Sequence, residues 1–230
     1  MAKKEMDKKV SGEDVGEFVS RAEEFIETNK KNITYGIIAI AVVIGAFVAW
    51  QHVYMAPKTK NAEIAIFKGE HYFMRDSFNL ALYGNGFDYD GFEYIIEQYG
   101  GTKSGNLAKA YAGICYFKLG DMDNAIKYLK SFKTKEDNIA PAIIGLIGDC
   151  YIESGDIPQG ISYFEKAASK ANNDLLSPVY LKKAGIAYEF LKDYKNAIKS
   201  YTAIKDKHAA SMEAMDIDKY ITRAQILSEK

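Results

Sequence analysis

Three segments of the chain align with one another at nearly constant spacing, and this repetition limits the fold more than any other feature. Each has a glycine, a tyrosine three residues later and an aspartate five residues after that. A small residue follows four positions further on, and a large one four beyond it. The segments are AGICYFKLGDMDNAIKYLKSF from Ala112, IGDCYIESGDIPQGISYFEKA from Ile147 and AGIAYEFLKDYKNAIKSYTAI from Ala184. Their glycines, Gly113, Gly148 and Gly185, are 35 and 37 residues apart. A period of this length predicts stacked structural units, none of which buries its apolar face alone.

The pattern resembles the tetratricopeptide repeat, a helix–turn–helix unit with a period of 34 residues. A small residue on each first helix lets the second helix approach closely, and the turn between them reverses the chain. The sequence departs from the repeat at Lys109, where a large apolar residue is usual, and at Lys192, which replaces the turn glycine of the third copy. The resemblance implies an all-α fold, a tetratricopeptide-repeat helical solenoid.

The resemblance also divides the chain beyond residue 58. It implies a repeat domain at 58–230, made of a degenerate repeat with a long loop at 58–101, repeats at 106–137, 141–172 and 178–207, and a capping helix at 211–230. Within the degenerate repeat, residues 76–91 break the helical rhythm. Phe78, Leu80 and Leu82 alternate like a short strand, and Gly84 to Gly86 indicate a turn.

Ile33 to Tyr54 is a run of 22 residues without Asp, Glu, Lys or Arg. As a helix it would be about 33 Å long, enough to cross a hydrocarbon core of about 30 Å. A buried core helix rarely continues this far without a charge. A cleaved signal peptide has a shorter apolar run and a small-x-small site, and no convincing site of that kind follows Trp50. The run therefore predicts a single uncleaved transmembrane helix at 33–54.

Residues 1–32 precede this helix and contain an amphipathic segment at 13–29. That segment could lie in the membrane interface or dock on a partner. Basic residues near the two ends of the apolar run are tied at three each, but the Lys30–Lys31 pair and the large trailing domain favour a cytoplasmic N-terminus. The expected topology is a single-pass protein of the bacterial inner membrane with a periplasmic repeat domain. Within the span, the small residues Ala41, Gly45 and Ala49 recur every four positions and form a face on which another helix could pack, although such residues are common in membrane helices anyway.

The composition indicates a protein without catalytic machinery. The chain carries 30 basic and 31 acidic residues, so it lacks the basic excess of a nucleic-acid binder. Its three histidines have no neighbours at metal-ligand spacing, and no phosphate loop or nucleophile elbow is present. Cys115 and Cys150 occupy the same place in consecutive repeats, which favours a small core position over a disulfide. We expect no enzyme activity, no metal and no cofactor.

The inner face of a tetratricopeptide solenoid is lined mainly by the first helix of each repeat. Carried over by position, this predicts a mostly apolar protein-binding groove with a few charged edges. The groove residues are Leu107, Ala110, Ile114, Phe117, Asp149, Ile152, Val179, Lys182, Ile186, Glu189 and Phe190. Such a channel suits a hydrophobic extended segment or an amphipathic helix. Alternatively, some of these residues pack against the long loop or the cap.

The architecture as a whole is similar to the YfgM-type family, the ancillary subunits of the bacterial SecYEG translocon. The similarity covers the amphipathic lead-in, the single span, the repeats and the cap. It implies a non-catalytic membrane-anchored adaptor whose partners are translocon subunits, a periplasmic chaperone or secreted clients. Two other interpretations stay open: a scaffold for envelope assembly or cell division, and a reversed topology in which cytosolic repeats act as an import-type receptor.

Overall fold

The structure is a computed structural model that describes residues 12–229, and the chain divides into two compact units, with the boundary in the sequence between Pro57 and Lys58. Every regular element among the described residues is a helix. Residues 1–11, the start of the predicted cytoplasmic tail, lie outside them. The two units are described separately.

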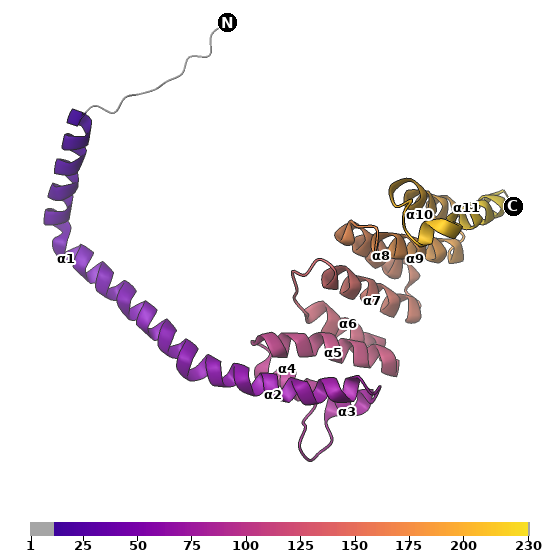
Figure 1. The fold of residues 1–230 in the computed structure, drawn as a ribbon, viewed down its shortest axis with the longest axis horizontal. Coiled ribbons are helices and arrows are strands. Elements are labelled where there is room, and N and C mark those ends of the chain that lie inside the picture. The colour runs from indigo at the N-terminus through magenta and orange to yellow at the C-terminus, as the bar shows by residue number, and fades with distance from the viewer. Residues whose placement is uncertain (1–11, 230) are drawn as a thin grey trace, which may run out of the picture. The chain divides into compact units, whose positions relative to one another are not determined.

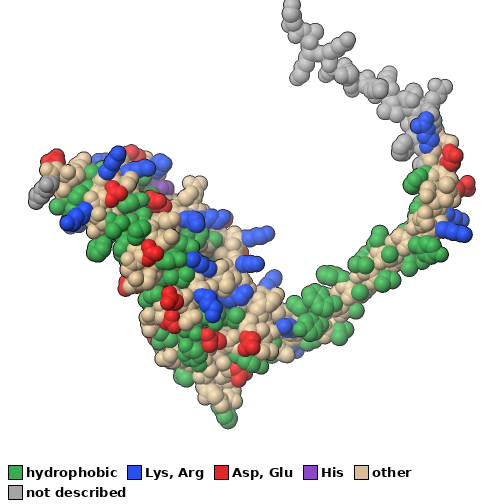
Figure 2. Space-filling view, turned by 180° about the vertical axis from the view of Figure 1, so that it is seen from behind, with side chains coloured by type: hydrophobic (Ala, Val, Ile, Leu, Met, Phe, Trp, Pro, Cys, Tyr) green, Lys and Arg blue, Asp and Glu red, His purple; other side chains and the backbone are tan. Residues whose placement is uncertain are grey.

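The first unit consists of helix α1 (Gly12–Trp50) and a π-helical turn, η1 (Gln51–Met55). Among the described residues, a single stretch of helix, Val19–Phe73, is long and apolar enough to cross a membrane, with a mean hydropathy of 2.3 in its most apolar part. None of that part is buried, and Figure 2 shows hydrophobic side chains along the helix. The predicted packing face is open at Gly45, because no other atom lies within 4 Å of where a Cβ would stand.

The second unit contains the remaining helices, which follow one another in chain order (Figure 1). They are α2 (Ala56–Phe73), α3 (Phe78–Tyr83), α4 (Phe92–Tyr99), α5 (Lys103–Leu119), α6 (Met122–Ser131), α7 (Ile139–Glu153), α8 (Ile157–Ala171), α9 (Ser177–Phe190), α10 (Tyr194–Lys207), the 3-10 turn η2 (Glu213–Asp216) and α11 (Ile217–Ser228). The three aligned sequence segments form the hairpins α5–α6, α7–α8 and α9–α10.

The repeated glycine and the repeated large residue of each segment contact each other across the hairpin. In the third hairpin, a Cβ placed on Gly185 would lie 2.3 Å from Cε1 of Tyr201, and the first two hairpins pair Gly113 with Leu129 and Gly148 with Phe164 in the same way. Side chains larger than hydrogen would therefore force the helices apart. The glycine that begins the repeated pattern and the large residue that ends it therefore pack against each other in every hairpin.

The repeated aspartate begins the second helix of each hairpin. Asp156 accepts a hydrogen bond from the backbone N–H of Gln159 at 3.2 Å, and Asp121 and Asp193 cap α6 and α10 in the same way. This is an N-cap, which satisfies a backbone donor that the first turn of a helix leaves without an intrahelical partner. Lys192 takes the left-handed conformation at φ 60°, so the third turn keeps the geometry of the others without their glycine.

The first helices of the second unit correct one prediction. Residues 78–83 form helix α3 instead of a short strand. Ala81 and Leu82 are adjacent and both fully buried, an arrangement that a helix packed on two sides allows and an alternating strand does not. They join a core with Phe92 and Ile95 of α4, and this core continues into α5, α6 and α7.

Cys115 and Cys150 are both buried and free. Burial raises the pKa of the Cys115 thiol to about 12 and that of Cys150 to about 11. These side chains act as small core residues, in agreement with their equivalent places in the repeats.

Candidate protein-binding groove

A pocket of about 410 Å³ lies between the second and third hairpins. It is built from both helices of the second hairpin and the first helix of the third. Its lining residues are Asp149, Ile152 and Glu153 of α7, Ile157 and Phe164 of α8, and Lys183, Ile186, Ala187 and Phe190 of α9. We call this the α7–α9 pocket.

The pocket has an apolar floor and an apolar mouth. Phe164 and Ala187 are buried, whereas Ile186 is 47% exposed and Phe190 is 75% exposed. Gly148 keeps Phe164 in place, because a Cβ there would come within 2.7 Å of the ring. Large apolar side chains are exposed to water beside an apolar hollow. Covering them with another apolar group would lower the free energy, so this surface favours binding.

One edge of the pocket is charged. Lys183 Nζ lies 2.8 Å from Oδ1 and 2.7 Å from Oδ2 of Asp149, and it also sits 5.5 Å from the centre of the Phe164 ring. Because the two charges satisfy each other, this pair presents no isolated charge to a ligand. Glu153 adds a negative charge at the rim.

Four of the residues predicted for the groove come together here: Asp149, Ile152, Ile186 and Phe190. Lys182 and Glu189 lie on α9 but do not line the pocket. Lys182 binds Asp216 at 2.8 Å. Glu189 accepts hydrogen bonds from Tyr201 at 2.8 Å and from Arg223 at 2.9 Å.

The other predicted groove residues lie outside the pocket as well. Leu107 is exposed on α5, and Ala110 of the same helix is buried. Ile114 and Phe117 are half-buried against the large core. Val179 is half-buried on α9.

The groove prediction made from the sequence did not include Phe164, Ile157 or Lys183, which also line the pocket. Phe164 was visible only as the large residue of the repeat pattern. Lys183 follows Asp149 by 34 residues, three fewer than the 37 that separate Gly148 from Gly185. A search for opposite charges about one repeat apart could have identified the pair.

Comparison with known proteins bears on the repeats. A family model described as tetratricopeptide repeat matches residues 111–138 and 179–211. The chain contains tetratricopeptide repeats. Two solved structures of MamA are similar to it: one has 16% sequence identity and a TM-score of 0.49, covering 74% of this chain and 92% of its own. The other has 18% identity and a TM-score of 0.41, covering 60% and 89%. None of the curated proteins compared with the chain matches it.

The tyrosine of the tetratricopeptide pattern carries a polar contact to the preceding repeat. Tyr188 donates to Glu165 of α8 at 2.8 Å, and Tyr116 donates to the equivalent Glu93 of α4, which also accepts from Tyr128. Burial, followed by the bond to Glu165, raises the pKa of Tyr188 to about 12. Burial also raises the pKa of Tyr116, so Tyr116 and Tyr188 remain neutral donors at physiological pH and join one repeat to the next.

Two further features concern the polar side chains of the described residues. Among the side chains that the structure describes, no group of three or more His, Cys, Asp or Glu could hold a metal ion. None of these described side chains has a buried nitrogen or oxygen without a hydrogen-bond partner. The repeats imply a protein-binding role, and no enzymatic family is indicated.

Proposed function

We propose that this protein is a membrane-anchored, non-catalytic adaptor that binds an apolar segment of a partner protein in the α7–α9 pocket. The observation that carries the proposal is the exposure of Ile186 and Phe190 beside an apolar hollow in a tetratricopeptide solenoid. A bulky apolar side chain of the partner would cover both. The internally paired Asp149 and Lys183 would lie at the rim of the interface, where they add selectivity more than affinity.

The anchor is the apolar helix at 33–54. Its length and composition support a membrane span, and the exposed small face at Ala41, Gly45 and Ala49 supports contact with a second membrane helix. In this proposal the span keeps the adaptor beside its membrane partner, and the solenoid receives a second protein. Anchoring raises the local concentration of the binding site and so favours weak contacts.

The resemblance to the YfgM-type family supports a finer assignment. It would place the N-terminus in the cytoplasm and the repeats in the periplasm, with the Sec translocon and periplasmic chaperones as partners. An envelope-assembly or cell-division scaffold would use the same anchor and groove. An import-type receptor would need the repeats in the cytosol.

Purification of the tagged full chain from membranes in mild detergent, with mass spectrometry of what stays attached, tests the assignment. Ile186→Lys places a charge in the mouth of the pocket and should remove the soluble partner. Leu175→Lys, at an exposed residue outside the pocket, is the matched control and should keep it. If both variants lose the partner, or if neither does, partner binding does not depend on the α7–α9 pocket.

The identity of the recovered proteins separates the candidate functions. Sec channel subunits together with a periplasmic chaperone would support the translocon assignment. Division or outer-membrane assembly proteins would replace it while keeping the adaptor role. A cysteine placed at Glu229 reports topology independently, because both native thiols are buried. Labelling from the cytosolic side alone would exclude a periplasmic repeat domain.

A further inference from the structure

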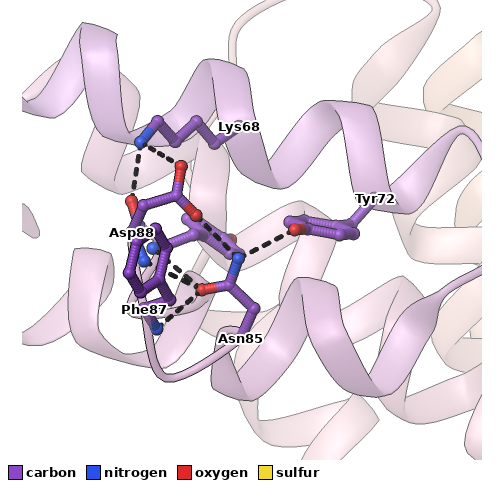
Figure 3. A network of polar contacts seen from close by, with 6 residues as sticks. Lys68, Tyr72, Asn85, Phe87 and Asp88 are labelled. Carbon is purple, nitrogen blue, oxygen red and sulfur yellow. Dashed lines mark hydrogen bonds and ion pairs between the residues drawn. The ribbon is translucent and has the colours of Figure 1, made fainter.

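The loop between α3 and α4, in the degenerate repeat, exposes a phenylalanine to water. Phe87 is 95% exposed. The loop around it is built on Asn85, whose Oδ1 accepts hydrogen bonds from three consecutive backbone N–H groups. These belong to Phe87 at 3.0 Å, Asp88 at 3.1 Å and Tyr89 at 3.1 Å. The exposed ring is therefore displayed by an ordered turn (Figure 3).

The loop is also tied to helix α2. Lys68 Nζ binds the backbone oxygen of Asp88 at 2.7 Å and its Oδ2 at 2.8 Å, and Asn85 Nδ2 donates to Tyr72 Oη at 2.9 Å (Figure 3). The base of the loop is closed by Tyr89, a buried residue whose hydroxyl donates to the oxygen of Ala81 at 2.8 Å. Much of the ordering cost of presenting Phe87 is met before any contact forms, which is the property of a preorganised anchor.

Phe87 is accompanied by apolar side chains of α2. Phe67 is 72% exposed, and Ile64, one turn earlier, is exposed as well. Ile64 lines one surface depression and Phe67 lines another. Asp88, the residue after Phe87, lines both. We call Ile64, Phe67 and Phe87 the end patch. The outer helix of a solenoid normally has a polar outer face, so an aromatic end patch requires a cover.

The connection to the anchor indicates what that cover is. Ile64 follows Tyr54, the end of the predicted span, by only ten residues, so as helix the two are about 15 Å apart and even as extended chain about 36 Å. The end patch is therefore tethered close to the surface of any bilayer that holds the span. Lys60, Glu63 and Lys68 line a depression with Ile64 and Phe67, and Lys68 is already paired with Asp88. Lys60 is therefore the basic group of the end patch that suits the headgroup layer.

We propose that the end patch docks on the bilayer and inserts Phe87 and Phe67 into the interface, which holds the first repeat against the membrane. The proposal rests on the anchor in the proposed function. Interfaces accept aromatic rings that have an apolar surround and nearby basic groups. The α7–α9 pocket shares no residue with the end patch, so docking would leave the side chains that line the pocket free to bind.

Fluorescence quenching of the full chain in phosphatidylcholine vesicles with brominated acyl chains tests the proposal. Trp50 is the only tryptophan, so the unmodified chain reports on the anchor itself. The double variant Trp50→Phe/Phe87→Trp reports on the end patch. Trp50→Phe/Met215→Trp is the matched control, because Met215 is 84% exposed in η2, far along the chain from the span.

We expect strong quenching of Trp50 and of the tryptophan at 87, with a blue-shifted emission at 87, and no quenching at 215. Quenching of Trp50 together with an unquenched, water-like emission at 87 would overturn docking while leaving the anchor intact. That result would also be the one expected if a protein covers the patch. An unquenched Trp50 would overturn the anchor and the docking together. Circular dichroism of each variant verifies that the helices are retained.

Discussion

Lys183 and Asp149 lie 34 residues apart and form an ion pair between neighbouring repeats, with Nζ 2.7 Å from Oδ2. The same separation joins Lys182 to Asp216, His208 to Asp174 and Arg223 to Glu189. Each pair therefore links side chains about one repeat apart in the sequence. Two of them connect α9 to the segment η2–α11, so the C-terminal helix continues the solenoid as the first half of another repeat.

The Asp149–Lys183 pair should contribute little to stability. Its side chains are 28% and 40% exposed, and partly exposed pairs are worth about 0–1 kcal/mol. A double-mutant cycle of Asp149→Ala and Lys183→Ala, followed by chemical denaturation, should give a coupling free energy of at most about 1 kcal/mol. A coupling several times larger would mean that the pair organises the hairpins and does more than line the pocket.

Gly185→Ala should destabilise the repeat domain. Alanine favours helix over glycine by about 1 kcal/mol, but its Cβ would collide with the fully buried ring of Tyr201, and overpacking typically costs about 1–3 kcal/mol. Gly101→Ala is the control, because nothing lies within 4 Å of its Cβ position. Denaturation midpoints should fall for the first variant and stay nearly unchanged for the second. A stabilised Gly185→Ala protein would show that the hairpin can open at no cost.

Much of the fold was predictable because each repeated residue has one local task. The glycine accepts a large side chain, the aspartate caps a helix, and both tasks leave a sequence signal at fixed spacing. Phe78, Leu80 and Leu82 gave a false signal, because the three residues alternate in sequence but do not share one buried face: Leu82 is buried and Leu80 is exposed on a short helix. The pocket was only half predictable. Ile186 and Phe190 followed from their place on a first helix, but whether Lys182 or Lys183 lines the pocket depends on the rotation of α9, which the spacing of apolar residues does not determine.

Asp156→Ala should lower the free energy of unfolding by about 0.5–2 kcal/mol, the usual cost of losing an N-cap. Asp156→Asn keeps a side-chain oxygen that can accept from the Gln159 N–H and should retain most of the stability. Thermal or urea unfolding of the two variants gives the comparison. Equal losses would indicate that the charge of Asp156, and not the cap, is what matters.

The two cysteines should be unreactive in the folded protein. Burial raises the pKa of Cys115 to about 12 and that of Cys150 to about 11, so at pH 8 neither offers thiolate or access. Titration with a thiol reagent should detect no reactive thiol in the native state and two after denaturation. Rapid reaction of one thiol in the native state would reveal local opening of its hairpin.

Stability should fall as the pH rises above about 10. Tyr188 has a folded pKa raised to about 12, against an unfolded value of about 10. The unfolded state therefore loses its proton first, and the stabilisation is complete below pH 10 and is lost between about pH 10 and 12. Tyr188→Phe should show a shallower decline of the unfolding free energy over this range. An identical pH profile would mean that Tyr188 titrates normally in the folded chain.

The most direct measurement of the central claim is site-specific photo-crosslinking in native membranes. A benzophenone amino acid replaces Phe190 at the mouth of the α7–α9 pocket, and the same group at the exposed Leu175 serves as the control. The adaptor function predicts a discrete crosslinked polypeptide at position 190 that is weak or absent at position 175, and its loss when Ile186→Lys is added. No crosslink at position 190, or the same crosslinks at both positions, would contradict binding of a partner at this pocket.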